Sequence, residues 1–113
     1  MSESTGREYT LIAAGVSELA DANPVQAGRV TPRKAFDGPG ARVRHLAFDA
    51  GAVLAEHVAP RPILVSVPAG RVRFTVGGVA HELSAGGMIH VAANVPHEVF
   101  AEEASHVLVT LLG

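Results

Sequence analysis

The chain has 113 residues and a mass of 11.7 kDa, which is the size of one domain. Its formal net charge is −2 and its nine basic residues are scattered, which argues against a nucleic-acid-binding stripe and a polybasic membrane patch. The sequence has no Cys, which excludes a disulfide scaffold, thiolate-ligated zinc, iron–sulfur clusters and a Cys nucleophile.

The N-terminal segment carries Glu3, Arg7 and Glu8 and lacks the apolar run that a secretory signal needs. Elsewhere the apolar stretches are far shorter than the roughly 20 residues with which a helix spans a bilayer. We therefore expect a cytoplasmic protein that binds neither a membrane nor nucleic acid.

The first elements in chain order are a short strand and a short helix. The sequence predicts the strand over Glu8–Ala14. Ser17 is predicted to cap a helical turn over Glu18–Ala22, which ends at Asn23 and Pro24. No other segment predicts a helix.

From Gln26 onward, Gly or Pro recurs between short runs rich in Val, Ile, Leu and Phe. Short strands separated in this way are typical of an all-β sandwich or barrel. The predicted strands are Arg42–Phe48, Val53–Val58, Ile63–Val67, Arg71–Val76, Val79–Leu83, Met88–Ala92, His97–Ala101 and Ser105–Leu112. We predict a single domain over residues 1–113, with an N-terminal arm over 1–41 and a barrel over about 42–112.

The dipeptide Gly77-Gly78 predicts a hairpin, because a two-residue Gly-Gly loop suits the primed turns that hairpins prefer. The register that follows pairs Val76 with Val79, Phe74 with His81, Arg73 with Glu82 and Val72 with Leu83. One face of this hairpin is then apolar and the other carries an opposite-charge pair. A slip of one residue would destroy both patterns.

The last predicted strand shows no alternation over Val107–Leu112, so both of its faces look buried. One face can meet the core of a small antiparallel protein, and the other needs a cover. A second copy of the chain is the simplest cover, so we expect a homodimer. The outer face of this strand is one candidate interface, and pairing of Glu8–Ala14 between subunits is the other.

Two histidines stand in distinctive surroundings. Gly51 precedes His57 by six positions, and Gly70 follows the short apolar strand after it. His97 closes the stretch Gly86-Gly-Met-Ile-His-Val-Ala-Ala-Asn-Val-Pro-His97. Together these segments resemble the two motifs of the small single-domain cupins, the cupin 2 conserved barrel with an RmlC-like jelly roll. The resemblance implies an all-β, antiparallel jelly-roll barrel, with one short N-terminal helical turn in this chain.

The resemblance also implies a place for a metal, since cupins bind iron, manganese, nickel or zinc with three His and one Glu. The first and last of these His match His57 and His97, which we expect to face each other across the barrel lumen. The second His falls on Ala59 and the Glu falls on Ile63. Two His fall one ligand short of a catalytic zinc or non-haem iron site, so any divalent metal is expected to be held weakly.

His45 and His90 are the candidates to complete the ligand set, because either could line the lumen from a neighbouring strand. The alternative is that they are ordinary strand residues. Glu56 and Glu98 adjoin the two motif histidines, but neighbours on a strand point to opposite faces.

The sequence favours a protein that binds a small molecule in the barrel lumen, with a weakly held divalent metal at the motif pair as a further option. The alternative is a metal-dependent cupin enzyme, namely a dioxygenase, isomerase or decarboxylase. The sequence leaves open which of the two applies, and it identifies neither catalytic residues nor a substrate.

Overall fold

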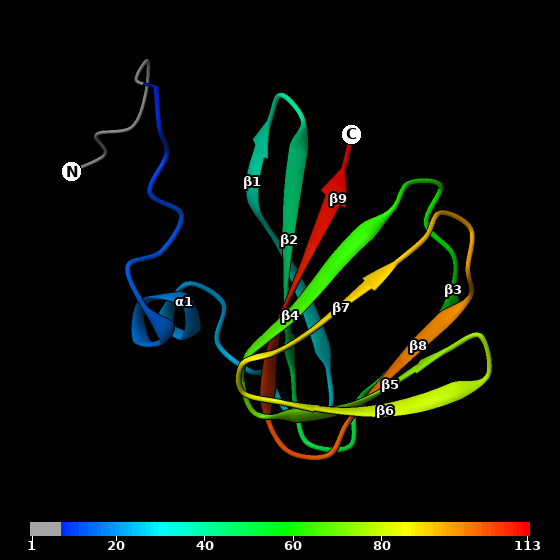
Figure 1. Ribbon diagram of the computed structural model, residues 1–113. Helices are drawn as coiled ribbons and strands as arrows, with labels where there is room; N and C mark the ends of the chain where they lie inside the picture. Colours follow the sequence, from blue (N-terminus) through cyan, green and yellow to red (C-terminus); the bar gives the residue numbers. More distant parts are fainter. Residues whose placement is uncertain (1–7) are drawn as a thin grey trace.

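The computed structural model describes residues 8–113, which hold one helix and nine strands (Figure 1). The elements are α1 (Val16–Ala22), β1 (Val30–Gly38), β2 (Ala41–Phe48), β3 (Val53–His57), β4 (Ile63–Ala69), β5 (Arg71–Val76), β6 (Val79–Ser84), β7 (Gly87–Val91), β8 (His97–Ala101) and β9 (Ser105–Leu112). No helix in this part of the chain is long and apolar enough to cross a bilayer.

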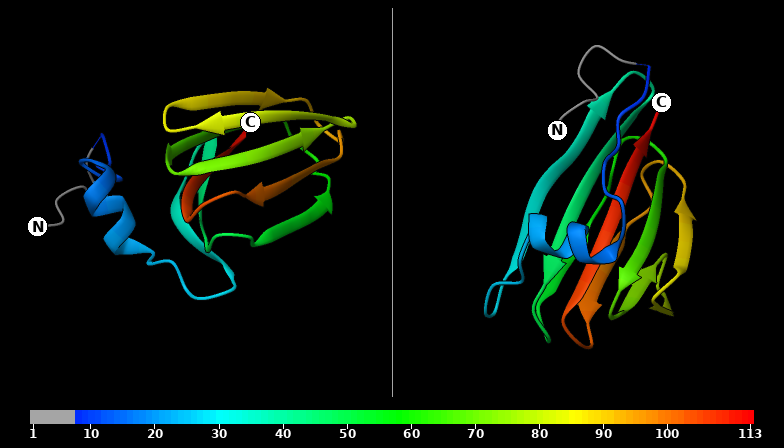
Figure 2. Two further views of the ribbon diagram at one scale, coloured as in Figure 1. Left: turned by 90° about the horizontal axis from the view of Figure 1, so that it is seen from below. Right: turned by 90° about the vertical axis from the view of Figure 1, so that its left-hand side faces the viewer.

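The strands form two antiparallel sheets that face each other (Figure 2). The first, which we call sheet A, has the order β1-β2-β9-β4-β7, and the second, sheet B, has the order β3-β8-β5-β6. The chain changes sheet repeatedly, so strands distant in sequence become neighbours. This is the jelly roll that the sequence predicts, with a single short helix outside it.

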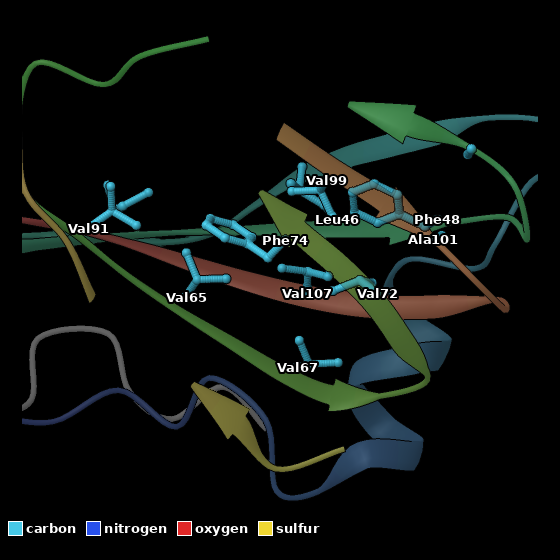
Figure 3. Packing of buried hydrophobic residues seen from close by; sticks show 12 residues of the cluster. Leu46, Phe48, Val65, Val67, Val72, Phe74, Val91, Val99, Ala101 and Val107 are labelled. Atoms are coloured by element: carbon cyan, nitrogen blue, oxygen red, sulfur yellow. The ribbon is translucent and has the colours of Figure 1, made fainter. Parts of the chain in front are cut away.

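The core lies between the two sheets and consists of alternate residues from their facing strands (Figure 3). In β4, for example, Ile63, Val65 and Val67 are buried while the residues between them are half-buried. Each buried Val or Phe side chain stabilises the fold by about 1.5–3 kcal/mol relative to exposure. The buried set includes Leu46, Phe48, Val72, Phe74, Val99 and Val107.

The β5–β6 hairpin forms at the predicted dipeptide and in the predicted register. Gly77 and Gly78 have φ angles of 57° and 82°, the left-handed values that a type I′ turn requires. Val76 pairs with Val79 across the turn, and Arg73 pairs with Glu82 on the outer face.

The N-terminal predictions need correction. Glu8–Ala14 belongs to no strand of either sheet. The segment instead runs along the outside of this sheet (Figure 2). The helix begins at Val16, and its N-cap is Gly15, without a side-chain hydrogen bond. Ser17 is therefore a residue of the first turn and not the cap.

Strand β1 was not predicted, because Pro32 and several charged residues interrupt its apolar pattern. It pairs with β2 along its length, with a bulge between Lys34 and Phe36. The predicted boundary of the arm at residue 41 therefore separates two strands that belong to one sheet.

The outer faces of the two sheets differ in charge. On sheet B, Arg73 lies near both Glu82 and Glu102, at 3.9 and 3.6 Å, and Arg71 bonds Glu102 at 3.1 Å. On sheet A, the strand registers show which residues of β2, β9, β4 and β7 point outward. None of these outward-facing residues is Asp, Glu, Lys or Arg. They are Ala41, Val43, His45, Ala47, His106, Leu108, Thr110, Leu112, Leu64, Ser66, Pro68, Met88 and His90.

Candidate functional site

A cavity of about 350 Å³ lies between the two sheets. Sheet A contributes one wall and sheet B the other, and the connection from β3 to β4 closes part of the rim. Figure 1 shows this connection at the same end of the barrel as the β1–β2 hairpin. The lining residues are Arg44, Leu46, Leu54, His57, Val58, Ala59, Pro60, Ile63, Val65, Phe74, His97, Val99, Val107, Val109 and Leu111. The lining is therefore apolar apart from two histidines and one arginine.

His57 and His97 form a pair in this cavity, as the motif resemblance implies. They are register partners on β3 and β8, beyond a bulge that follows Leu54. Their ring centroids lie 4.3 Å apart and the rings meet edge to face, at an interplanar angle of 64°. They are thus side by side on one sheet, and the expectation that they face each other across the lumen is wrong.

Backbone carbonyls fix the tautomers of both rings. Nδ1 of His57 lies 2.9 Å from the oxygen of Ala55, and Nδ1 of His97 lies 3.0 Å from the oxygen of Val95. Because a carbonyl oxygen only accepts, each Nδ1 carries the hydrogen and donates it. In the neutral ring, Nε2 is then left with a lone pair, which can accept a hydrogen bond or bind a metal.

His97 is the more buried partner, with 4% of its surface exposed, and its ring stacks on Phe74 at a centroid distance of 5.7 Å. Burial lowers the pKa of His97, the hydrogen bond to the Val95 carbonyl opposes this change, and the neighbouring His57 adds to the lowering. The His97 imidazole is therefore held neutral near pH 7, which is the form that accepts at Nε2.

Arg44 lines the cavity from the opposite wall, on β2. Its Nη1 donates to Oδ1 of Asp37 at 2.8 Å, and this bond is the main cause of the lowered pKa of Asp37. Sequence reasoning missed this residue as part of the site. The signal that could have revealed it is the alternation of β2. Arg44 lies between Val43 and His45, which are on the outer face, so it shares the inner face with Leu46 and Phe48.

The other two positions of the cupin metal shell carry side chains that cannot bind a metal. Ala59 and Ile63, where cupins carry the second His and the Glu, both line the cavity, and no carboxylate does. Within residues 8–113, no group of three or more His, Asp or Glu side chains is placed to hold one ion. The two imidazoles are suitable donors, and they are one fewer than the three protein ligands of a typical catalytic zinc or non-haem iron site.

His45 and His90 do not join the pair. His45 is fully buried on the outer face of sheet A, where Nε2 lies 2.9 Å from Nδ1 of His106 and Nδ1 lies 3.2 Å from Nη2 of Arg33. His90 is exposed on β7 and pairs with Leu64, also on the outer face. Neither lines the cavity, so the expectation that they complete the ligand set is corrected.

Solved structures of similar fold share little sequence with this chain. A conserved protein of unknown function from Streptococcus pyogenes superposes with a TM-score of 0.77 at 20% identity, over 88% of this chain and 87% of that one. An RmlC-like cupin from Shewanella frigidimarina gives 0.70 at 21% identity, over 76% and 78%. A cupin 2 conserved barrel domain protein from Leptotrichia buccalis gives 0.78 at 29% identity, over 85% of this chain and 47% of that one.

No curated protein matches the sequence. The family model described as the cupin domain, however, matches residues 44–112, which is more than half of the chain. That range runs from β2 to the end of β9 and includes both histidines of the cavity. The chain therefore belongs to the cupin family.

Proposed function

We propose that the protein binds a small, largely apolar molecule in the cavity between its sheets. The observation that carries this proposal is the cavity itself: about 350 Å³ of apolar lining with two adjacent imidazoles whose tautomers are fixed. Ligand sites in proteins are typically concave and mostly apolar, with a few polar groups that set the ligand's orientation. Here the Nε2 atoms of His57 and His97 accept hydrogen bonds from the ligand.

A neutral apolar dye, N-phenyl-1-naphthylamine, tests whether the cavity takes a ligand. We expect its fluorescence to rise on binding and to stay low with Ala59→Trp, because the indole fills the cavity at its rim. Ala80→Trp, on an exposed residue of the outer face of sheet B, is the matched control and should bind the dye as the unmodified chain does. Equal dye binding by the two Trp variants would contradict the proposal.

A second candidate is a metal-dependent cupin enzyme of the dioxygenase, isomerase or decarboxylase kind. One observation favours it: a ligating His commonly donates its other ring N–H to a backbone carbonyl, as both His57 and His97 do. The lack of a third ligand argues against it. Metal analysis of the purified protein, before and after treatment with a chelator, distinguishes the two, since one tightly held ion per chain would favour the enzyme.

A further inference from the structure

The formal charge that lines the cavity is of one sign only. Among its lining residues, Arg44 alone carries a formal charge, and the two histidines are its other polar side chains. Asp37, the partner of Arg44, does not line the cavity and is about half-exposed. A molecule in the cavity therefore meets a positive group from sheet A and no negative group.

We infer that the cavity is built for a small organic monoanion, with its apolar body between the sheets and its carboxylate on the guanidinium of Arg44. This inference rests on the proposed function and names the class of ligand. An arginine offers a planar set of donors that matches a carboxylate, and such charge-assisted bonds are about twice as strong as neutral ones.

The guanidinium has donors to spare for such a ligand. Within residues 8–113, Arg44 contacts the carboxylate of Asp37 and the backbone oxygen of Val43 through Nη1 alone. Nε and Nη2 are left for a second carboxylate. Asp37 thus holds the guanidinium in place while competing with the ligand for its charge.

The apolar walls strengthen this interaction. Charges attract more strongly where contact with water is reduced. The residues next to Arg44 on the inner faces of β2 and β9 are Leu46 and Val109, and the gain is moderate because 29% of the Arg44 side chain is exposed. A divalent cation would meet the opposite situation, because it would share the cavity with a guanidinium and find no carboxylate. The same lining that disfavours a resident metal therefore favours an anion.

Benzoate and benzamide form a matched pair of probes, since they have nearly the same shape and differ in charge. We expect amide chemical shifts of the cavity strands to give a dissociation constant about tenfold lower for benzoate. Arg44→Met keeps the apolar stem of the side chain and should remove this difference. Arg42→Met is the control, because Arg42 is also on β2 but does not line the cavity, and it should preserve the difference.

The substitution Asp37→Asn should change the affinity for benzoate in the direction opposite to Arg44→Met. Removal of the competing carboxylate should tighten benzoate binding several-fold and leave benzamide unchanged. Equal affinities for the two probes, with no effect of Arg44→Met, would overturn the anion proposal while the cavity remained a binding site. Failure of both probes to shift any cavity residue would instead contradict the proposed function itself.

Discussion

The imidazoles of His45 and His106 share a hydrogen bond of 2.9 Å on the outer face of sheet A. Arg33 fixes its direction, because Nε and Nη2 of the guanidinium lie 3.4 and 3.2 Å from Nδ1 of His45 and only donate. Nδ1 of His45 therefore accepts, its Nε2 carries the hydrogen, and Nδ1 of His106 accepts in turn. A proton added at Nδ1 of His45 would break this chain of bonds.

This arrangement predicts a loss of stability in acid. Burial, followed by the charges of His106 and Arg33, lowers the pKa of His45 to about 4 from 6.5. Between these values the unfolded chain takes up a proton that the folded chain does not. The free energy of unfolding should therefore decrease as the pH falls from about 6.5 to about 4, by at most about 1.4 kcal/mol per pH unit for this residue.

Urea unfolding at a series of pH values measures this loss. His45→Gln should make it less steep, because the amide can accept from Arg33 and donate to His106 without titrating. His81→Gln, on an exposed residue of β6, should leave the steepness unchanged. An identical pH dependence in all three proteins would show that His45 is not the responsible group.

Metal affinity should be low and should respond to restored ligands. Because Ala59 and Ile63 replace an imidazole and the only carboxylate of the cupin shell, we expect weak Zn²⁺ binding. The double variant Ala59→His with Ile63→Glu should raise the affinity strongly. Calorimetric titration with Zn²⁺ measures both effects.

The same carboxylate should be harmful without metal. Ile63 is 2% exposed, so Ile63→Glu buries an unpaired charge and should destabilise the apo protein by several kcal/mol. Ile63→Leu is the control for the change of shape. If Zn²⁺ bound to the double variant no better than to the unmodified chain, the two histidines would not occupy cupin ligand positions.

We propose that a second copy of the chain covers the outer face of sheet A over the strands β9, β4 and β7, where no Asp, Glu, Lys or Arg side chain lies. The N-terminal segment leaves Tyr9, Leu11 and Ile12 exposed, and a groove of about 440 Å³ lies between this segment and the sheet. The chain thus carries both an exposed apolar strip and a sheet face without charged side chains, and a two-fold dimer could pack one against the other. The charged outer face of sheet B is suited to water instead.

Sedimentation at micromolar concentration should therefore show a species of twice 11.7 kDa. Leu108→Glu places a charge on the outer face of β9 and should dissociate it, whereas Ala80→Glu, on the outer face of sheet B, should not. A purely monomeric chain would refute the dimer. Val109 is unsuitable for this test, because it lines the cavity on the inner face.

Ala substitutions at Gly70 and Gly86 can distinguish the cost of backbone strain from the cost of steric crowding, because the two glycines have nearly the same φ angle. Gly70 and Gly86 have φ angles of 93° and 94°, so an Ala is strained by about 1–2 kcal/mol at either. At Gly70 the added Cβ would also lie 2.5 Å from the oxygen of Ala104 and against the side chain of Ser105, whereas at Gly86 it meets nothing within 4 Å. Gly70→Ala should therefore cost about 1–3 kcal/mol more than Gly86→Ala in urea unfolding. Equal losses would mean that the neighbours yield.

The sequence predicts the fold better than it predicts the site. The sequence predicts the β5–β6 hairpin to the residue, because Gly77-Gly78, the alternation and the pair Arg73–Glu82 all require one register. The family resemblance rests on two motifs of which Gly51, Gly70, Gly86, His57 and His97 are present, although Ala59 replaces one motif His. The segment Glu8–Ala14 was predicted as a strand from local pattern alone, although a strand also needs a partner edge, which the local pattern does not reveal.

The site depends on which face of a strand is turned inward. Alternation shows that His45 shares a face with Val43 and Ala47, but not that this face is the outer one. The larger side chains of Leu46 and Phe48 on the other face were the available signal. Arg44 on β2 was difficult to predict for the same reason. A charged residue is expected to point to solvent, so the sequence does not indicate that its side chain lines a cavity.

The histidine pair lies on sheet B and Arg44 lies on sheet A, so a bound ligand can link the motions of the two sheets. A ligand held by both would tie β8 of sheet B to β2 of sheet A, two strands that are not hydrogen-bonded to each other. Opening of either sheet would then require release of the ligand. Saturation with 4-hydroxybenzoate, whose carboxylate can bind Arg44 and whose hydroxyl can donate to a histidine Nε2, should slow amide hydrogen exchange in β2 and β8 by the same factor, and Arg44→Met should abolish the effect in both strands at once.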